Sequence, residues 1–120
     1  MYEYNAIVNR VVDGDTFDAT VDLGFGVFKK HRFRLKDVDT PETWRPKTEA
    51  EKKHGMEASQ YVMELIEDKA VVLSSVKSAV YSRYEAYVTL EGGHDLGTLL
   101  IEHGFEKLDS YPEDDINDTI

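Results

Sequence analysis

The chain has 120 residues and carries 24 acidic against 14 basic side chains, a net charge of −10. This length suits one domain with a single modest core, and the absence of cysteine excludes disulfides, thiolate metal sites and a cysteine nucleophile. The sequence contains no run long and apolar enough to span a membrane, and its first 30 residues lack the apolar region of a signal peptide. We therefore expect a cytoplasmic protein that does not bind membranes.

The distribution of charge bears on the class of partner. Residues 91–120 hold nine acids and one base, whereas residues 29–54 hold nine bases and five acids. An acidic protein is a poor non-specific binder of nucleic acids, because that affinity comes largely from neutralised phosphates. A local basic stretch beside carboxylates is still compatible with a phosphate-bearing substrate. The overall charge thus argues against tight binding and not against phosphate chemistry.

The first part of the chain predicts three strands joined by tight turns. The predicted strands cover residues 4–12, 16–23 and 27–38. The first is rich in β-branched side chains, and the other two alternate between apolar and polar residues. Because Asp37 falls on the apolar side of this alternation, we expect the third strand to bend or end there. Three consecutive antiparallel strands form a meander, which curls readily into a small barrel.

The second part predicts a long helix, two strands and a short helix. Thr48 and Glu51 fit a capping box that would start the long helix near residue 48, and a start near Gly55 after a mobile loop fits equally well. Strands are expected at 70–76 and 83–90, and Asp95 caps the short helix. The order β-β-β-α-β-β-α predicts a mainly β domain, a five-stranded barrel with helices packed on it.

The predicted domain boundary lies near residue 108. From Asp109 onward the chain is acidic and lacks a pattern of buried positions, so we expect a folded domain of residues 1–108 and a disordered tail of residues 109–120.

The stretch Asp39-Thr40-Pro41-Glu42 places two carboxylates and a hydroxyl at the end of a predicted strand. Pro41 fixes its own φ and holds Thr40 in an extended conformation. The Asp39 carboxylate and the Thr40 carbonyl are therefore held at a rigid strand end, where hard oxygen ligands could face one ion. Taken alone, this stretch is equally well interpreted as a polar turn after a strand.

Three motifs occur in a fixed order along the chain. They are Val-Val-Asp-Gly-Asp-Thr at 11–16, Phe-Arg-Leu-Lys-Asp-Val-Asp-Thr-Pro-Glu-Thr at 33–43, and Tyr-x-Arg at 81–83. With these motifs the sequence resembles the staphylococcal-nuclease-like (thermonuclease) family over residues 4–108. The resemblance implies an OB-fold barrel and a Ca²⁺-dependent enzyme that hydrolyses phosphodiester bonds of DNA and RNA to 5′-hydroxyl and 3′-phosphate products.

The resemblance also implies roles for individual residues. The positions that match the family's metal ligands are Asp15, Asp39 and the carbonyl of Thr40. The positions that match its catalytic residues are the phosphate-contacting Arg34 and Arg83 and the carboxylate Glu42, proposed to activate water. Tyr81 matches a tyrosine that lines the nucleotide pocket. This set is chemically coherent, because phosphodiester hydrolysis builds negative charge that fixed cations and paired arginine hydrogen bonds can stabilise.

Each of these residues also has a purely structural interpretation. Asp15 and Asp39 could be solvated strand ends, and Arg34 a surface residue of a strand. Arg83 could pair with Glu85 on its own strand, an interaction that contributes little. The functional interpretation is favoured because five side chains match family positions together.

The sequence departs from the family pattern in several places. Val80 stands where family members commonly carry a lysine, Ser82 and Tyr84 replace glycines, and the aromatic pair expected after the last helix is reduced to Tyr111. With the acidic composition, these differences lead us to expect weaker and more salt-sensitive binding of polynucleotides.

Two main hypotheses follow. The first is an intracellular or phage-borne nuclease that acts on DNA and RNA, with single strands as the expected form and no obligate protein partner. The alternative is a non-catalytic module that binds protein or nucleic acid. A domain that had lost catalysis should have lost Arg34, Glu42 or Arg83, and all three are present, which favours the nuclease. A third hypothesis, an acidic mimic of nucleic acid, is supported only by the tail.

Overall fold

A computed structural model describes residues 2–76 and 84–114 of the chain. The elements run in the order β1 (Tyr2–Asp13), β2 (Thr16–Asp22), β3 (Phe28–Leu35), α1 (Glu49–Ile66), β4 (Ala70–Val76), β5 (Tyr84–Leu90) and α2 (Leu96–Glu102). This is the predicted order of strands and helices. None of the described helices is long and apolar enough to cross a membrane.

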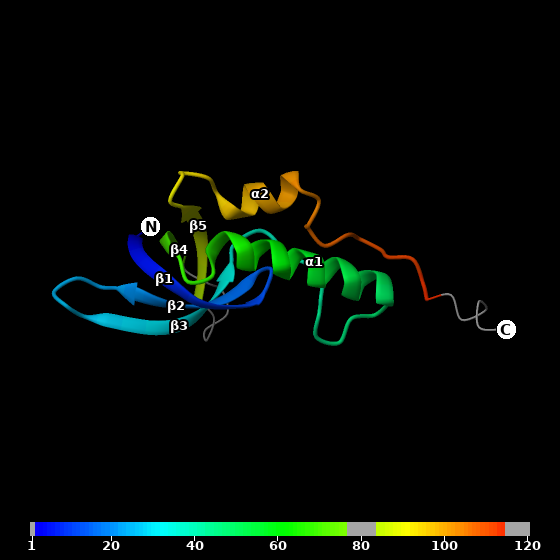
Figure 1. Ribbon diagram of the computed structural model, residues 1–120, viewed down its shortest axis with the longest axis horizontal. Helices are drawn as coiled ribbons and strands as arrows, with labels where there is room; N and C mark the ends of the chain where they lie inside the picture. The colour runs from blue at the N-terminus through cyan, green and yellow to red at the C-terminus, as the bar shows by residue number, and fades with distance from the viewer. Residues whose placement is uncertain (1, 77–83, 115–120) are drawn as a thin grey trace.

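The strands close into a barrel in the order β1-β2-β3-β5-β4 (Figure 1). Neighbouring strands are antiparallel except β3 and β5, which pair in parallel from Phe33–Tyr84 to Leu35–Ala86. Within the described part of the chain, residues 28–32 of β3 pair with β2 alone, because β5 joins β3 only at residues 33–35. The predicted five-stranded OB-fold barrel with two helices is therefore confirmed.

The core fills the barrel and continues under the two helices. Alternate side chains of each strand point inward, and the stacked rings of Phe17 and Phe33 lie 5.8 Å apart in the interior. The helices contribute fully buried aliphatic side chains to the same cluster, namely Val62, Ile66, Leu96 and Leu100. Burying one such side chain stabilises the fold by about 1.5–3 kcal/mol.

Two local predictions are settled by the backbone. The Thr48 hydroxyl accepts a hydrogen bond from the Glu51 amide at 3.1 Å, so α1 begins at the earlier of the two expected starts. β3 ends at Leu35 rather than Val38, because its pairing with β5 stops there. Asp37, where a bend was expected, has a positive φ of 68°.

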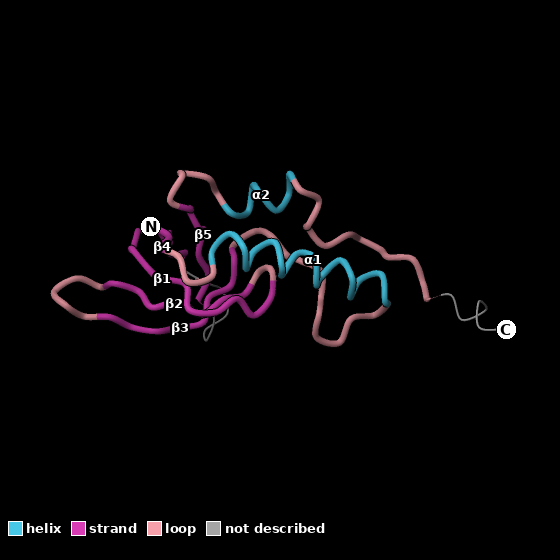
Figure 2. Tube along the Cα trace, in the orientation of Figure 1, coloured by secondary structure: helices cyan, strands magenta, loops and turns pink. Residues whose placement is uncertain are grey.

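The hairpin between β2 and β3 projects from the barrel (Figures 1 and 2). Its turn is closed by a hydrogen bond of 2.8 Å from the Leu23 amide to the Val27 carbonyl. Phe25 lies at the tip with a φ of 55°, between Gly24 and Gly26, which also have positive φ. Its side chain is fully exposed.

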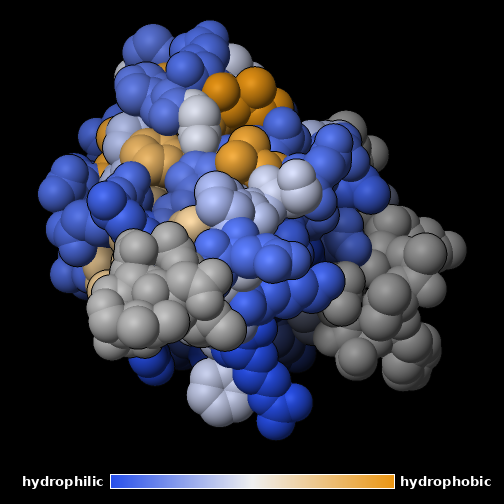
Figure 3. Space-filling view, turned by 90° about the vertical axis from the view of Figure 1, so that its right-hand side faces the viewer, coloured by the Kyte–Doolittle hydropathy of each residue, from blue (hydrophilic) through white to orange (hydrophobic). Residues whose placement is uncertain are grey.

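The chain after α2 returns along α1. The Tyr111 hydroxyl lies 2.6 Å from His54 Nδ1, and the Glu49 amide donates to Asp114 Oδ1 at 2.7 Å. Asp114 is the last residue described, so the description covers residues 109–114 of the predicted tail. Viewed from this end, the surface is predominantly hydrophilic, with apolar side chains gathered mainly in its upper half (Figure 3).

Candidate functional site

Asp15 lies at the turn between β1 and β2, and its carboxylate joins this turn to a distant loop. The carboxylate is buried, and its Oδ2 atom accepts a hydrogen bond of 3.0 Å from the Thr40 amide. Its Oδ1 atom accepts one of 3.0 Å from the Thr16 hydroxyl. The neighbouring Gly14 allows this close approach, since a Cβ atom there would lie 2.8 Å from Thr40 Cγ2. The loop of residues 36–43, which we call the site loop, is thus held against the turn.

Arg34 projects from the outer face of β3 toward the same carboxylate. Its Nη2 atom lies 3.7 Å from Asp15 Oδ2 and forms a direct ion pair with Asp39 Oδ1. Burial by itself would lower the pKa of Arg34, but the hydrogen bond that it donates to Asp39 and the charges of Asp15, Asp39 and Glu42 raise the pKa overall. The guanidinium is therefore permanently charged, and two carboxylates converge on one of its nitrogens.

Helix α1 packs directly on the backbone of the site loop. A Cβ atom at Gly55 would lie 2.6 Å from the Pro41 carbonyl and 3.1 Å from the Glu42 carbonyl. Only a glycine permits this contact without a shift of the loop. Glu42 itself is exposed, and the Thr43 hydroxyl next to it donates a hydrogen bond to Asp13. The backbone that carries Glu42 is consequently fixed from two sides.

The oxygen atoms of this region suit a hard divalent cation. Two carboxylates, those of Asp15 and Asp39, approach the same nitrogen of Arg34, and the Thr40 carbonyl belongs to the same loop as Asp39. Ca²⁺ takes six to eight such ligands, and water or substrate would have to complete the set. In the part of the chain that the structure describes, no cluster of three or more His, Asp or Glu side chains is arranged to hold a metal. The predicted ligands, two carboxylates and one backbone carbonyl, match calcium in chemical type but do not form such a cluster of side chains.

Most of the predicted site residues are brought together. Asp15, Arg34, Asp39 and Thr40 are in contact through the bonds above, and Glu42 follows on the same loop. Arg83 and Tyr81 lie outside the described residues. The chain resumes at β5, whose first residues pair with the end of β3, so that Glu85 lies opposite Arg34.

Comparison with known proteins agrees with this geometry. Residues 32–118 match the family described as "Staphylococcal nuclease homologue". The chain belongs to this family. Over 110 residues it is 34% identical to Endonuclease YhcR of Bacillus subtilis (strain 168). The aligned segment covers 86% of this chain and 9% of that protein. Over 111 residues it is 32% identical to Thermonuclease of Staphylococcus intermedius. The aligned segment covers 91% of this chain and 62% of that protein.

The chain thus spans less than two thirds of the length of either relative. The matches confirm the predicted resemblance to the staphylococcal nuclease family. The region matched by the family includes Arg34, the site loop and α1, which are the elements that build the candidate site.

Two contacts of the site in this family member were not predicted from the sequence. The Lys107 amide donates a hydrogen bond of 2.7 Å to the Asp39 carbonyl, which anchors the site loop to the chain after α2. No sequence pattern indicates this contact. The approach of Gly55 to the site loop was also missed, although a glycine inside an otherwise regular helix is itself a signal of close packing.

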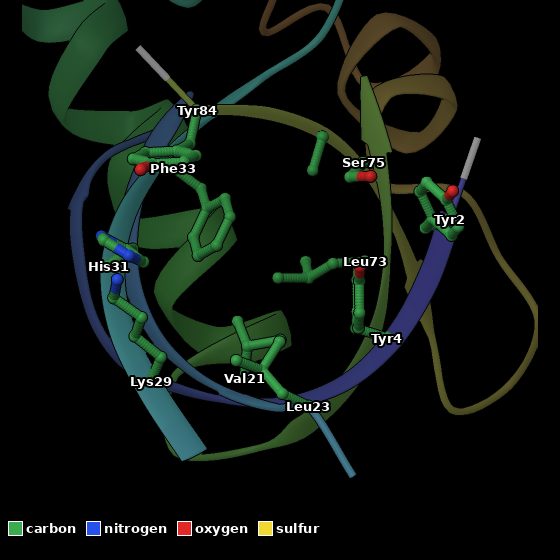
Figure 4. A pocket seen from close by; sticks show the side chains of 11 residues that line it. Tyr2, Tyr4, Val21, Leu23, Lys29, His31, Phe33, Leu73, Ser75 and Tyr84 are labelled. Carbon is green, nitrogen blue, oxygen red and sulfur yellow. The ribbon is translucent and has the colours of Figure 1, made fainter. Parts of the chain in front are cut away.

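A pocket lies at the open mouth of the barrel (Figure 4). It has a volume of about 550 Å³ and is lined mainly by aromatic and aliphatic side chains, including Tyr2, Tyr4, His31, Phe33, Leu73 and Tyr84. Asp15 and Arg34 are not among the residues of this pocket. Since β3 side chains alternate, the mouth and the candidate site lie on opposite faces of the barrel wall.

Proposed function

We propose that this chain is a Ca²⁺-dependent nuclease that hydrolyses phosphodiester bonds of DNA and RNA to 5′-hydroxyl and 3′-phosphate products. The observation that carries the proposal is the cluster of Arg34, Asp15 and Asp39 at one point of the barrel wall. It is supported by the names of two relatives, an endonuclease and a thermonuclease. The expected substrates are single strands.

Arg34 acts in this proposal as a phosphate clamp. Negative charge develops on the equatorial phosphoryl oxygens during hydrolysis, and a guanidinium can donate two parallel hydrogen bonds to them. In the structure one of its nitrogens is engaged by Asp39. Phosphate binding through this nitrogen would require Arg34 to exchange Asp39 for the substrate, which is favourable once the two carboxylates are neutralised in another way. Calcium held by Asp15, Asp39 and the Thr40 carbonyl would supply that neutralisation and would act as a Lewis acid toward a phosphoryl oxygen.

Glu42 acts as the group that accepts the proton of the attacking water. It is exposed, it lies close enough to influence the pKa of Arg34, and its backbone is held by α1. A positioned general base contributes roughly 10²–10⁴-fold to a rate. The contact between Gly55 and the Glu42 carbonyl would limit the positions from which this carboxylate can reach the water.

The test is cleavage of a single-stranded oligonucleotide at low salt, with calcium or with a chelator, by the native chain, Arg34→Ala and Arg34→Lys. We expect cleavage that needs calcium and falls by orders of magnitude in both variants, because lysine keeps the charge but not the two-pronged hydrogen bonding. Thermal unfolding of the variants checks that the fold is retained. Cleavage in the chelator would overturn the calcium requirement, and near-native rates for Arg34→Ala would overturn the clamp. Calcium binding without any cleavage would favour a non-catalytic module.

A further inference from the structure

The outer face of β1, β2 and β3 gathers positive charge in a chain whose net charge is −10. Asp18 of β2 lies at its centre and accepts two hydrogen bonds from Arg32, at 2.9 and 3.3 Å. Lys30 and Arg10 surround the same carboxylate, and together with Arg32 they lower its pKa. We call this surface the cationic face; its basic residues are Arg10, Lys30, Arg32 and Arg34.

The cationic face leads directly to the candidate site. Lys30, Arg32 and Arg34 are alternate residues of β3 and therefore point to the same side of the strand. Their partners across the ladder to β2 include Thr20, opposite Lys30, and Asp18, opposite Arg32. The row thus runs along the outside of the barrel and ends at the proposed phosphate clamp.

The charges of this face are only partly cancelled within it, because Arg32 pairs with Asp18 and Arg34 with Asp15 and Asp39. Asp18 is one carboxylate among several cations. Asp22, near the hairpin, accepts a hydrogen bond of 2.8 Å from the Gly24 amide. Among the described residues, Lys30 forms no ion pair, and Arg34 is paired only with the carboxylates of the site itself. A chain of phosphates has the complementary charge at a comparable spacing.

Exposed aromatic side chains continue the row on the projecting hairpin. Phe28 lies on the same side of β3, two residues before Lys30, and is 63% exposed. Phe25 at the tip is fully exposed and contributes nothing to the core. Phe28 and Arg34 are six positions apart, which is about 20 Å along a strand. Aromatic rings beside a cationic groove are the arrangement that binds single strands by stacking on their bases.

We propose that the cationic face binds a single-stranded polynucleotide segment that flanks the cleaved phosphodiester. Lys30, Arg10 and Arg32 contact its phosphates, and Phe28 stacks on one of its bases. The proposal rests on the proposed function in one respect: the position of the strand along the cationic face is set by the phosphate that Arg34 holds. A ligand that offers only phosphates would leave the exposed ring of Phe28 unused. A duplex keeps its bases inside, so a single strand is the ligand that uses both the basic side chains and this ring.

The chain offers a matched control in two adjacent lysines. Lys30 points outward, whereas Lys29 belongs to the lining of the barrel mouth on the inner side of β3 (Figure 4). Removing either one changes the net charge by the same amount. A difference in affinity between Lys30→Ala and Lys29→Ala therefore reports the effect of the lysine's position on the barrel and not of the overall charge.

The experiment is an NMR titration of the full chain with a short oligothymidylate at low salt in a chelator, so that binding is read without turnover and weak affinities are measurable. We expect amide shifts along β2 and β3 at the cationic face. Lys30→Ala and Phe28→Ala should each weaken binding by about five- to tenfold, and Lys29→Ala by less than twofold. Since no cleavage is involved, this result stands or falls separately from the proposed nuclease activity.

Three outcomes would overturn the inference. Equal weakening by Lys29→Ala and Lys30→Ala would assign the effect to net charge or to the barrel mouth. Binding of a duplex that is as tight as that of the single strand and insensitive to Phe28→Ala would remove the stacking role. Shifts at the hairpin with phosphatidylserine vesicles but not with the oligonucleotide would identify a membrane surface as the ligand.

Discussion

Asp15 is a buried carboxylate, a group whose removal from water is costly unless it is hydrogen-bonded and charge-compensated. Here the Thr40 amide and the Thr16 hydroxyl donate to it and the Arg34 guanidinium lies 3.7 Å away. The residue type and its place in the motif could be read from the sequence. Its hydrogen bond from the Thr40 amide could not be predicted from the sequence. Asp15 and Thr40 are 25 residues apart, and their contact depends on the closed barrel.

Replacing Asp15 by alanine should remove calcium binding and destabilise the fold. The Thr40 amide would lose its acceptor inside the protein, which costs about 1–3 kcal/mol. Calorimetric calcium titration and urea unfolding measure the two effects. Asp13→Ala, which removes the acceptor of the Thr43 hydroxyl and no proposed ligand, is the control and should still bind calcium. An unchanged calcium titration for Asp15→Ala would show that it is not a ligand.

The pair of Asp18 and Arg32 predicts a dependence of stability on acid. The hydrogen bonds from Arg32 lower the pKa of Asp18 in the folded protein. The pair therefore stabilises the fold above the ordinary carboxyl pKa, and this contribution is lost as the pH falls through the lowered value. The native chain should lose more stability than Arg32→Gln between about pH 5 and pH 2. Parallel unfolding curves for the two proteins over this range would contradict the assignment.

Among the elements, α1 does most to position the site loop. The capping residues and the apolar stripe could be recognised in the sequence, and the helix starts after Thr48 as the capping box indicates. The periodicity of a helix shows which face is buried, but not what it packs against. The contact of Gly55 with the Pro41 carbonyl was therefore out of reach. The early end of β3 was missed for a similar reason, since it depends on where pairing with β5 stops.

Gly55→Ala should separate helix propensity from packing. Alanine favours an isolated helix by about 1 kcal/mol, yet its Cβ atom would lie 2.6 Å from the Pro41 carbonyl. We expect a net destabilisation of about 1–3 kcal/mol and slower turnover, because the Glu42 backbone must move. Chemical denaturation and kcat measure the two effects.

Gly92→Ala is the control for this substitution. The nearest atom to a Cβ at Gly92 is His94 Cδ2 at 3.4 Å, an ordinary contact, and the position has no positive φ. The control should be nearly neutral in stability and in turnover. A Gly55→Ala protein that is more stable than the native chain and equally active would show that α1 does not hold the site loop in place.

At the scale of the whole molecule, charge is segregated. The acids gather toward the C-terminal end, whereas several cations share one face of the barrel. The segregation along the chain was visible in the sequence. Its spatial form was not, because Arg10 comes from another strand than Lys30 and Arg32. Likewise, the sequence did not indicate the parallel pairing of β3 and β5, since short strands do not disclose their partners.

Deletion of residues 109–120 should leave the fold intact and strengthen the binding of single strands. The segment carries five acids and no base, so its removal reduces repulsion of phosphates. It also removes the bond between Tyr111 and His54, which should cost about 1 kcal/mol of stability. NMR titration and thermal unfolding measure the two effects.

Tyr111→Phe serves as the comparison, because it removes the hydroxyl and leaves the charge unchanged. It should reproduce the small loss of stability without the gain in affinity. If the deletion fails to fold, or if it binds no more tightly than Tyr111→Phe, then the segment supports the barrel and does not act through its charge.

The hydrogen bond from the Lys107 amide to the Asp39 carbonyl makes the site loop observable without substrate or metal. This amide and the Thr40 amide, which donates to Asp15, can take up deuterium only when their bonds open. Local openings of a native protein occur in cooperative units. Equal exchange rates at Thr40 and Lys107 would mean that the site loop and the chain after α2 open as one unit. Faster exchange at Lys107 would mean that the C-terminal segment detaches first and leaves the loop closed on Asp15.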